Sequence, residues 1–244
     1  MLTEQRYAKI LKLLDKQNSV TVAELTGLLD ASESTVRRDI TALDKAGRLT
    51  KVFGGAVSNR QSFAHYEPTV AQKQELYRKE KQQIARHAAS LITSEDFVYL
   101  DAGTTTGMIL DYLPDNGATF VTNAVAHAQK LAGRGFEVHL IGGILKPSTE
   151  AVIGSQAILT LQTFHFTKGF FGTNGITQET GFTTPEAQEA LVKKTALAQC
   201  AQRYILSDHS KFGCTSSVTF ASLEDAVILT DQKIHGFEAV VCKE

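Results

Sequence analysis

The chain has 244 residues, of which 43% are hydrophobic, and this length suits one large domain or two smaller ones. The net charge is −1, but residues 1–60 contain ten Lys and Arg against seven Asp and Glu, whereas the remainder contains 15 against 19. No apolar run is long enough to span a membrane, and we expect the acid-containing first 16 residues not to be a signal peptide.

The N-terminal part of the sequence predicts a helix followed by a helix-turn-helix. The first helix runs from Thr3 to about Lys16, and we expect the side chain of Arg6 to be solvated. Thr21 is placed to cap a second helix, and Ser32 is placed to cap a third helix from Glu33 to Ala46. The apolar residues of the second helix recur at helical spacing: Val22, Leu25, Leu28 and Leu29.

The third helix has the composition of a DNA recognition helix. Hydroxyl and guanidinium groups gather in its first two turns, at Ser32, Ser34, Thr35, Arg37 and Arg38. A recognition helix places such N-terminal side chains in the major groove, where Arg binds guanine through two hydrogen bonds. Gly54-Gly55 follows as a two-residue hairpin signal, and the hairpin would form a wing that carries Lys51 toward the DNA backbone. A generic helical hairpin with a solvated charged face is the alternative.

Residues 22–56 resemble the DNA-binding segment of the DeoR family of bacterial transcriptional repressors. The most typical part is SESTVRRDITALDKAG followed by the GGA turn. The resemblance implies a winged helix-turn-helix that binds double-stranded operator DNA, which we assign to residues 1–58. It also implies a phosphosugar-sensing domain further along the chain.

Residues 59–74 are polar and aperiodic, contain Pro68, and are predicted to link the two domains. The second domain is assigned to residues 75–244 and begins with a helix predicted from Glu75 to Thr93. Short β-rich runs then alternate with helical stretches, which predicts an α/β sandwich with a largely parallel sheet. The β-rich runs are 97–100, 119–121, 137–141, 169–171, 204–207, 226–229 and 238–241.

Binding sites in parallel α/β folds lie outside the carboxyl ends of the strands, so the loops after each run are candidates. The first of these loops begins at Asp101, and its Gly103 allows a ligand to approach the backbone closely. Thr104, Thr105 and Thr106 offer hydroxyl and amide groups at a helix start, where phosphate binds. A plain strand-to-helix turn is the alternative reading of this one loop.

Small polar loops follow the other strands and complete a predicted effector site. Their candidate residues are Asn123, Gly143, Thr173, Asn174, Gly175, Glu186 and Lys211. Lys211 supplies a cation for a phosphate, while Asp101, Asn174, Glu186 and Asp208 could hold sugar hydroxyls. Lys193 and Lys194 are expected on a solvated helix face, with the alternative that one of them reaches the pocket.

These loops also resemble the sensor domain of the DeoR family, because YLDAGTTT, VTN, TNGI, GFTTPE and DHSKF stand in the family's order. The resemblance implies a fold similar to ribose-5-phosphate isomerase and a phosphorylated sugar as effector. LDASEST combined with DAGTTTG, GFTTPE and DHSKF is most similar to the branch that controls fructose operons. That branch implies fructose 1-phosphate, or a relative of it, as the inducer.

We therefore expect a cytoplasmic repressor that forms a homodimer or homotetramer, because paired half-sites gain affinity from a second linked contact. The three cysteines show no metal spacing and suit a reducing compartment, so we expect no metal and no cofactor. A sugar-phosphate isomerase with a DNA-binding appendage is the alternative, and an activator rather than a repressor is a third possibility. The candidate titratable groups form an incomplete acid–base constellation for that reaction, so we expect no enzymatic activity.

Overall fold

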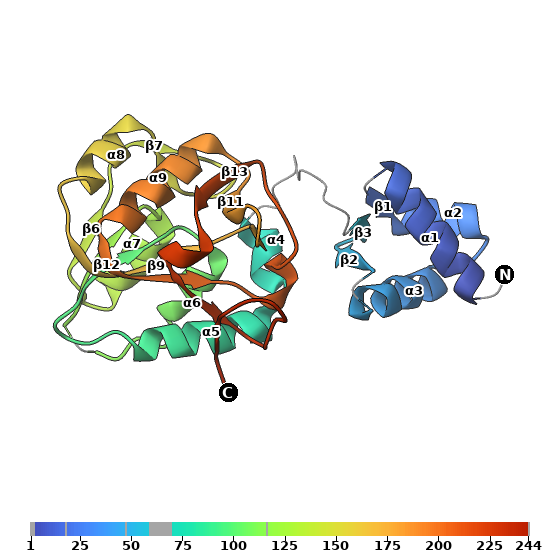
Figure 1. Cartoon of the computed structure of the whole chain (residues 1–244), viewed down its shortest axis with the longest axis horizontal. Coiled ribbons are helices and arrows are strands. Elements are labelled where there is room, and N and C mark those ends of the chain that lie inside the picture. The colour runs from blue at the N-terminus through green and yellow to red at the C-terminus, as the bar shows by residue number, and fades with distance from the viewer. Residues whose placement is uncertain (1–2, 18, 47, 59–69, 116, 244) are drawn as a thin grey trace. The chain divides into compact units, whose positions relative to one another are not determined.

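The computed structural model describes residues 3–17, 19–46, 48–58, 70–115 and 117–243 (Figure 1). The chain divides into an N-terminal and a C-terminal compact unit, with the division between residues 63 and 64. Most of the stretch expected as a linker, 59–69, lies outside the described residues. Its last part forms helix α4 (Val70–Glu75) of the C-terminal unit.

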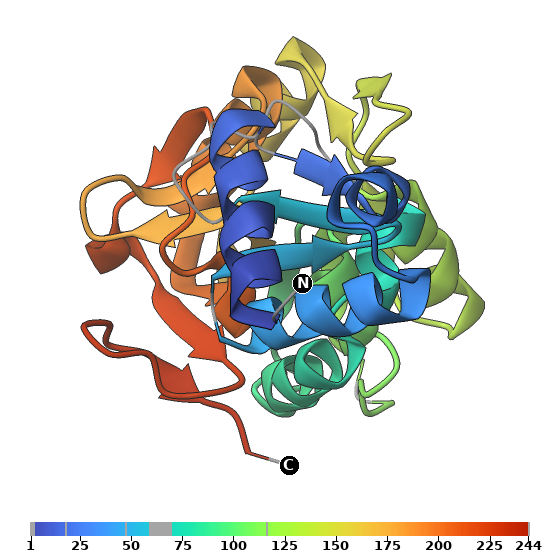
Figure 2. The same cartoon turned by 90° about the vertical axis from the view of Figure 1, so that its right-hand side faces the viewer.

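The N-terminal unit consists of three helices and a three-stranded antiparallel sheet, which face the viewer in Figure 2. Its helices are α1 (Thr3–Gln17), α2 (Val22–Leu29) and α3 (Glu33–Lys45), and its strands are β1 (Ser19–Thr21), β2 (Leu49–Val52) and β3 (Gly55–Ser58). Both predicted caps are confirmed. Thr21 forms a capping box with Glu24, and the Ser32 hydroxyl accepts a hydrogen bond from the Thr35 amide at 3.3 Å.

The core of this unit joins all three helices to the sheet. It consists of Ile10, Leu14, Val20, Val22, Leu25, Leu29, Val36, Ile40, Leu43, Leu49 and Ala56. Leu28 departs from the predicted apolar face, because its side chain is 57% exposed. The helix packs through the other three apolar positions, which suffice for so short an element.

The hairpin turn of the wing differs from the prediction by one residue. Val52 pairs with Gly55, so the turn consists of Phe53 and Gly54, and Gly54 has the left-handed φ of 81°. Gly55 lies instead in strand β3, where a Cβ atom would be 2.0 Å from the carbonyl oxygen of Val20. The second glycine therefore serves a close approach between strands β3 and β1.

The C-terminal unit is built on a seven-stranded sheet in which every strand pair is parallel, with the order β15-β14-β12-β9-β4-β5-β6. The strands are β4 (Phe97–Leu100), β5 (Thr119–Thr122), β6 (Val138–Leu140), β9 (Phe166–Gly172), β12 (Cys200–Leu206), β14 (Val227–Thr230) and β15 (Val240–Val241). The predicted largely parallel sheet is thus confirmed.

Helices cover both faces of this sheet (Figure 1). Helices α5 (Arg78–Ser90), α6 (Thr104–Ile109) and α7 (Val125–Gly133) pack on one face, against a cluster that includes Val98, Leu100 and Phe170. Helices α8 (Ser155–Leu161) and α9 (Ala187–Ala198) pack on the other face, against a cluster that includes Tyr99 and Phe171. Adjacent residues of one strand thus serve opposite layers, as the alternation of side chains along a strand requires.

Two small antiparallel elements were missed by the sequence prediction. One is a sheet in the order β10 (Gly175–Thr177), β11 (Gly181–Thr184) and β13 (Val218–Ala221), and the other is the hairpin of β7 (Ile144–Leu145) and β8 (Val152–Ile153). The predicted continuous helix 75–93 is also wrong. It breaks between α4 and α5 at Tyr77, which has a φ of 52° and packs its ring edge-on against His209 at 5.1 Å.

Candidate DNA-binding surface and effector cavity

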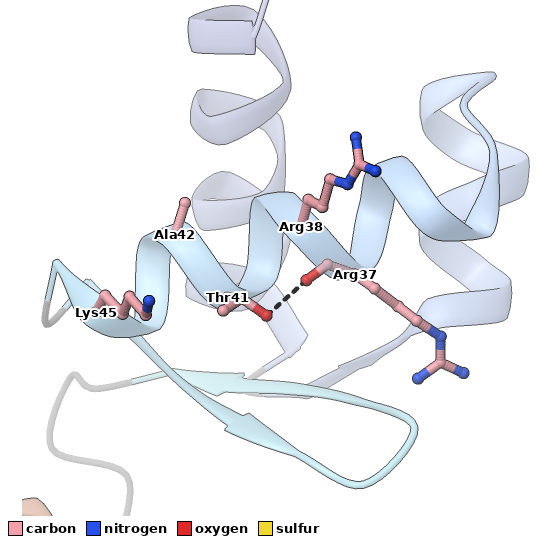
Figure 3. A pocket seen from close by; sticks show the side chains of 5 residues that line it. All are labelled: Arg37, Arg38, Thr41, Ala42 and Lys45. Atoms are coloured by element: carbon pink, nitrogen blue, oxygen red, sulfur yellow. Dashed lines mark hydrogen bonds between the residues drawn. The ribbon is translucent and has the colours of Figure 1, made fainter.

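The exposed face of α3 carries the predicted DNA-binding residues. Ser32, Ser34, Arg37 and Arg38 are exposed, and Thr35 is half-buried. Figure 3 shows Arg37 and Arg38 along this helix with Thr41, Ala42 and Lys45, which together line a shallow hollow. Helix α3 therefore presents guanidinium, ammonium and hydroxyl groups on one surface, as a recognition helix requires.

Contacts within this surface are of the weak, exposed kind. The Arg37 guanidinium lies 2.5 Å from the Glu33 carboxylate, and both side chains are more than half exposed. On the wing, the Lys51 Nζ atom donates a hydrogen bond to the Thr41 hydroxyl at 3.0 Å, which holds strand β2 beside α3. Exposed pairs of this kind contribute little to stability, so these cations can exchange their partners for phosphate or base atoms at small cost.

Arg6 is half-buried and paired, which corrects the expectation that it is solvated. Its side chain is 13% exposed, and its guanidinium makes two hydrogen bonds to the carboxylate of Asp39, of 2.5 and 3.0 Å. The hydrogen bond to Asp39 also raises the pKa of Arg6. This bidentate pair joins α1 to α3 and thereby fixes the buried side of the helix whose other side is exposed.

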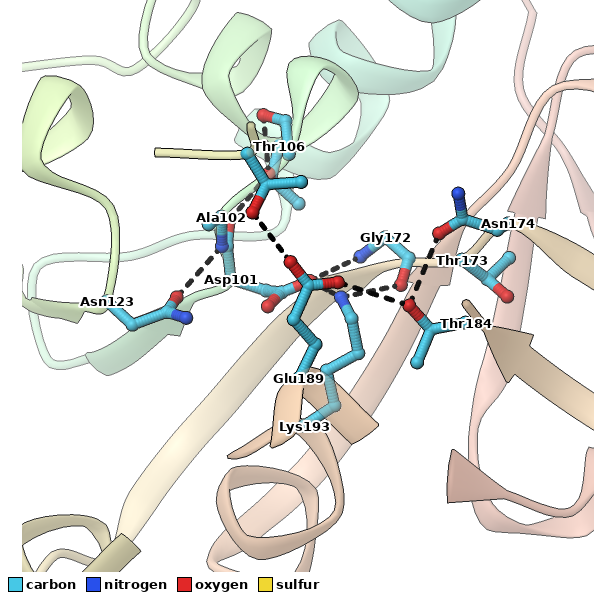
Figure 4. Close-up of polar contacts among 12 residues, drawn as sticks. Asp101, Ala102, Thr106, Asn123, Gly172, Thr173, Asn174, Thr184, Glu189 and Lys193 are labelled. Carbon is cyan, nitrogen blue, oxygen red and sulfur yellow. Dashed lines mark hydrogen bonds and ion pairs between the residues drawn. The ribbon is translucent and has the colours of Figure 1, made fainter. Parts of the chain in front are cut away.

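A polar cavity of about 90 Å³ lies in the C-terminal unit, at the carboxyl ends of strands β4, β5, β9 and β12. Eight of the predicted effector residues line it: Asp101, Gly103, Thr104, Thr105, Asn123, Thr173, Asn174 and Lys211. These residues come from four separate loops, which the parallel sheet brings to one edge. Figure 4 shows several of them converging with residues of α9.

A buried ion pair lies in the lining of this cavity. The Lys193 ammonium contacts the carboxylate of Asp101 and donates a hydrogen bond to the carbonyl oxygen of Gly172 at 3.1 Å. The Gly172 amide donates to the Asp101 carboxylate at 3.0 Å. Burial raises the pKa of Asp101, and the adjacent Lys193 opposes that rise. Lys193 therefore does not lie on a solvated helix face but reaches the cavity, which was the alternative for this pair of lysines.

The helical spacing of α9 contains a signal for Lys193. Ala190 and Ala196 lie three residues to either side of it and both are buried, so the same helix face carries Lys193 into the core. Glu189 also lies on this face and also lines the cavity. Its carboxylate accepts hydrogen bonds from Thr149 at 2.6 Å and from Lys146 at 3.0 Å, so the β7–β8 hairpin is joined to α9.

Lys81 of α5 is a second cationic residue that sequence reasoning missed. Its side chain is 4% exposed, and its Nζ atom donates a hydrogen bond to the carbonyl oxygen of Lys73 in α4. Burial lowers the pKa of Lys81 to about 8, while the nearby Asp208 opposes this and Lys211 adds to it. The cavity lining contains four lysines and three carboxylates: Lys73, Lys81, Lys193, Lys211, Asp101, Glu189 and Asp208.

Four predicted effector residues do not line the cavity. Thr106 holds the first loop in place, because its hydroxyl donates to the carbonyls of Asp101 and Gly103 at 2.7 and 3.0 Å. Glu186 forms an ion pair with Lys146. Gly143 and Gly175 serve close backbone approaches, since a Cβ atom would lie 2.5 Å from Ile153 O and 2.4 Å from Cys214 O, respectively.

The amide of Asn123 supports the cavity rather than only lining it. Its side-chain oxygen accepts a hydrogen bond from the Ala102 amide at 2.9 Å, and its nitrogen donates to the Val152 carbonyl at 3.2 Å.

Among the described residues, no group of three or more His, Cys, Asp or Glu could hold a metal ion. Within the same residues, no helix is long and apolar enough to cross a membrane.

Fold and site together define a protein in which a helix-turn-helix unit is joined to an α/β unit with a charged polar cavity. Residues 6–62 match the DeoR-like helix-turn-helix domain, and residues 77–232 match the DeoR C terminal sensor domain. The chain therefore belongs to the DeoR family of transcriptional regulators.

Similar proteins of known name cover nearly the whole chain. It is 40% identical over 231 residues to the uncharacterized HTH-type transcriptional regulator FruR of Bacillus subtilis, and the match covers 94% of this chain and 91% of that protein. It is 34% identical over 235 residues to the lactose phosphotransferase system repressor of Streptococcus mutans, with 95% and 93% covered. Ribose 5-phosphate isomerase A from Neisseria gonorrhoeae is a structural neighbour, with a TM-score of 0.41 and 12% identity over 57% of this chain and 54% of that one.

Proposed function

We propose that this protein represses a sugar-utilisation operon and that a phosphorylated sugar, bound in the cavity of the C-terminal unit, induces that operon. Fructose is the proposed sugar class and fructose 1-phosphate the first candidate inducer, because LDASEST, DAGTTTG, GFTTPE and DHSKF resemble the fructose-operon branch of the family. Similarity to lactose phosphotransferase system repressors supports the assignment to a repressor of sugar metabolism. We further propose a homodimer or homotetramer, because two linked half-site contacts raise affinity for an operator.

The chemistry of the cavity carries the proposal of a phosphorylated ligand. Lys81 and Lys211 come from different elements and line one cavity, where their ammonium groups suit a phosphate. Asp208 and the amide of Asn174 line the same cavity and suit the hydroxyl groups of a sugar. A ligand with an anionic end and a neutral polyhydroxy end therefore matches the lining better than either part alone.

A thermal-shift panel of sugar phosphates on the purified protein tests the ligand class. A compound that binds only the folded protein must raise its apparent melting temperature. We expect fructose 1-phosphate to raise it and free fructose not to. Lys211→Ala should reduce the shift, and Lys194→Ala should not, because Lys194 is exposed on α9 and does not line the cavity. A panel in which no sugar phosphate stabilises the protein would contradict the proposed effector class.

Operator binding is tested separately, with duplexes selected from a random-sequence library by the full-length protein. Arg38→Ala should abolish specific binding and leave the thermal shift intact, because the guanidinium lies on the exposed face of α3. Lys194→Ala again serves as the control. Specific binding of normal affinity by the Arg38 variant would refute the role of α3 as recognition helix.

Allosteric induction requires that the effector bind the DNA-free and DNA-bound arrangements with different affinities. We expect the effector to weaken operator binding by the unmodified chain and to have less effect on the Lys211→Ala variant.

The isomerase alternative predicts turnover of a pentose or hexose phosphate, which a coupled assay would detect. Such turnover would make the protein an enzyme as well as a regulator.

A further inference from the structure

The tip of the wing carries an aromatic side chain that does not pack into the protein core. Phe53 is 100% exposed, and it occupies the first position of the β2–β3 turn, before Gly54. The residues next to it are different, because Val52 is half-buried and Gly55 is buried. An aromatic ring fully in water is an unfavourable arrangement that becomes favourable when a partner covers it.

The tip is held in a defined position by contacts on both sides of the turn. The Val22 amide, at the start of α2, donates a hydrogen bond to the Gly54 carbonyl at 2.7 Å. On the other strand, the Lys51 amide donates to the Asp44 carboxylate of α3 at 2.9 Å. Phe53 therefore projects from a scaffold attached to both helices of the helix-turn-helix, so ordering it on binding costs little.

The surroundings of Phe53 indicate a polyanionic partner. Arg48 is exposed directly before strand β2 and Lys51 is exposed within it, and the exposed arginines of α3 belong to the same small unit. Double-stranded DNA combines a phosphate backbone for such cations with apolar surfaces for a phenyl ring, namely deoxyribose and the faces of partly unstacked bases. Proteins that bind the minor groove use Phe in this way, as a wedge between base steps.

We infer that Phe53 enters the minor groove beside the half-site that α3 reads, where it contacts a flexible pyrimidine–purine step. This inference rests on the proposed binding of α3 in the major groove. The ring adds affinity that does not depend on salt, and it makes binding sensitive to bases that α3 does not touch, because pyrimidine–purine steps unstack most easily. The neighbouring Lys51 contributes the salt-dependent part of the wing's binding.

The test compares Phe53→Ala with Lys51→Ala in the full-length protein, on a duplex selected by the unmodified chain from a random-sequence library. Phe53→Ala should weaken DNA binding roughly 10- to 100-fold, the range expected when the burial that a Phe side chain gains on the DNA is lost. Because the ring is neutral, the slope of log affinity against log salt should stay unchanged, whereas Lys51→Ala should reduce that slope by about one. Phe53→Leu should recover part of the lost affinity.

A fluorescent base analogue locates the ring. 2-Aminopurine placed at each pyrimidine–purine step flanking the half-site should brighten at one step with the unmodified protein and stay dim with Phe53→Ala. The melting temperature of Phe53→Ala should equal that of the unmodified chain, because a fully exposed ring contributes no core packing.

Three results would overturn the inference. The first is a DNA affinity of Phe53→Ala within about twofold of that of the unmodified protein. The second is equal 2-aminopurine brightening with both proteins. The third is a different oligomeric state of Phe53→Ala in sedimentation, which would mean that a second copy of the chain covers the Phe53 ring. The proposed function fails in a different way, since the unmodified protein would then select no duplex at all.

Discussion

Replacement of Lys81 by Met is expected to change how the stability of the C-terminal unit depends on pH. Lys81 is 4% exposed, and its burial lowers its pKa from the ordinary 10.5 to about 8. Met has a similar length and no titratable group. The variant therefore removes one buried charge while it keeps most of the apolar contacts of the side chain.

The sign and size of the effect follow from the two pKa values of Lys81. Between pH 8 and 10.5 the unfolded chain retains the proton on this lysine while the folded chain releases it, so stability rises with pH over that window. Below about pH 8 the folded protein carries the full cost of the buried charge. Each pKa unit corresponds to about 1.4 kcal/mol, so the full difference amounts to roughly 3 kcal/mol.

Urea unfolding followed by far-ultraviolet circular dichroism measures this difference, from neutral pH to above 10.5, in both proteins. Other lysines, tyrosines and cysteines titrate in both, so the stability of the unmodified chain minus that of the variant isolates Lys81. We expect this difference to increase by about 3 kcal/mol across the window. Lys194→Met, at an exposed position of α9, should show no such increase. Parallel curves for Lys81→Met and the unmodified chain would refute the reasoning.

Two further predictions concern other parts of the molecule. Gly55→Ala should destabilise the N-terminal unit by about 1–3 kcal/mol in calorimetry, because the new Cβ atom would lie 2.0 Å from the carbonyl oxygen of Val20. Gly27→Ala in α2 serves as the control and should be neutral or stabilising, because nothing lies within 4 Å of the new Cβ atom. Equal melting temperatures of the Gly55→Ala and Gly27→Ala variants would contradict the packing argument. The hydrogen bond from the His209 ring to the Asp231 carboxylate raises the pKa of His209, so Asp231→Asn should lower that pKa in an NMR titration. A raised histidine pKa stabilises the fold below the ordinary value of 6.5, and this contribution is lost as pH rises through the folded pKa. The loss of stability that Asp231→Asn causes through His209 should therefore be confined to mildly acidic pH. An unshifted His209 resonance in the variant would contradict this prediction.

Local signals predicted the DNA-binding unit well. The caps at Thr21 and Ser32 depend only on residues within the following turn, so sequence suffices to place them. The wing turn was misplaced because two consecutive glycines offer the same turn signal, and only the approach of Val20 shows which one lies in a strand. The break in the helix at Tyr77 coincides with a ring contact to His209, a residue distant along the chain that no local pattern reveals.

The lining of the cavity was predicted where it follows from strand order and missed where it depends on packing. Loops after parallel strands converge at one sheet edge whatever their details, so Asp101, Asn123 and Thr173 could be placed together. Lys81 and Lys193 come from helices instead, and a lysine on a helix is normally solvated. The buried positions of Ala190 and Ala196 hint at the inward direction of Lys193, whereas the burial of Lys81 is seen only in the packed structure.

The buried charges of the cavity also explain why an anion would suit it. Lys193 is matched by the carboxylate of Asp101, and Glu189 is matched by Lys146. Lys81 has a neutral carbonyl as its hydrogen-bond acceptor, and burial lowers its pKa more than the nearby Asp208 raises it. A phosphate beside Lys81 would supply a further opposite charge, so part of the free energy spent on burying this lysine would be regained on binding of the proposed effector.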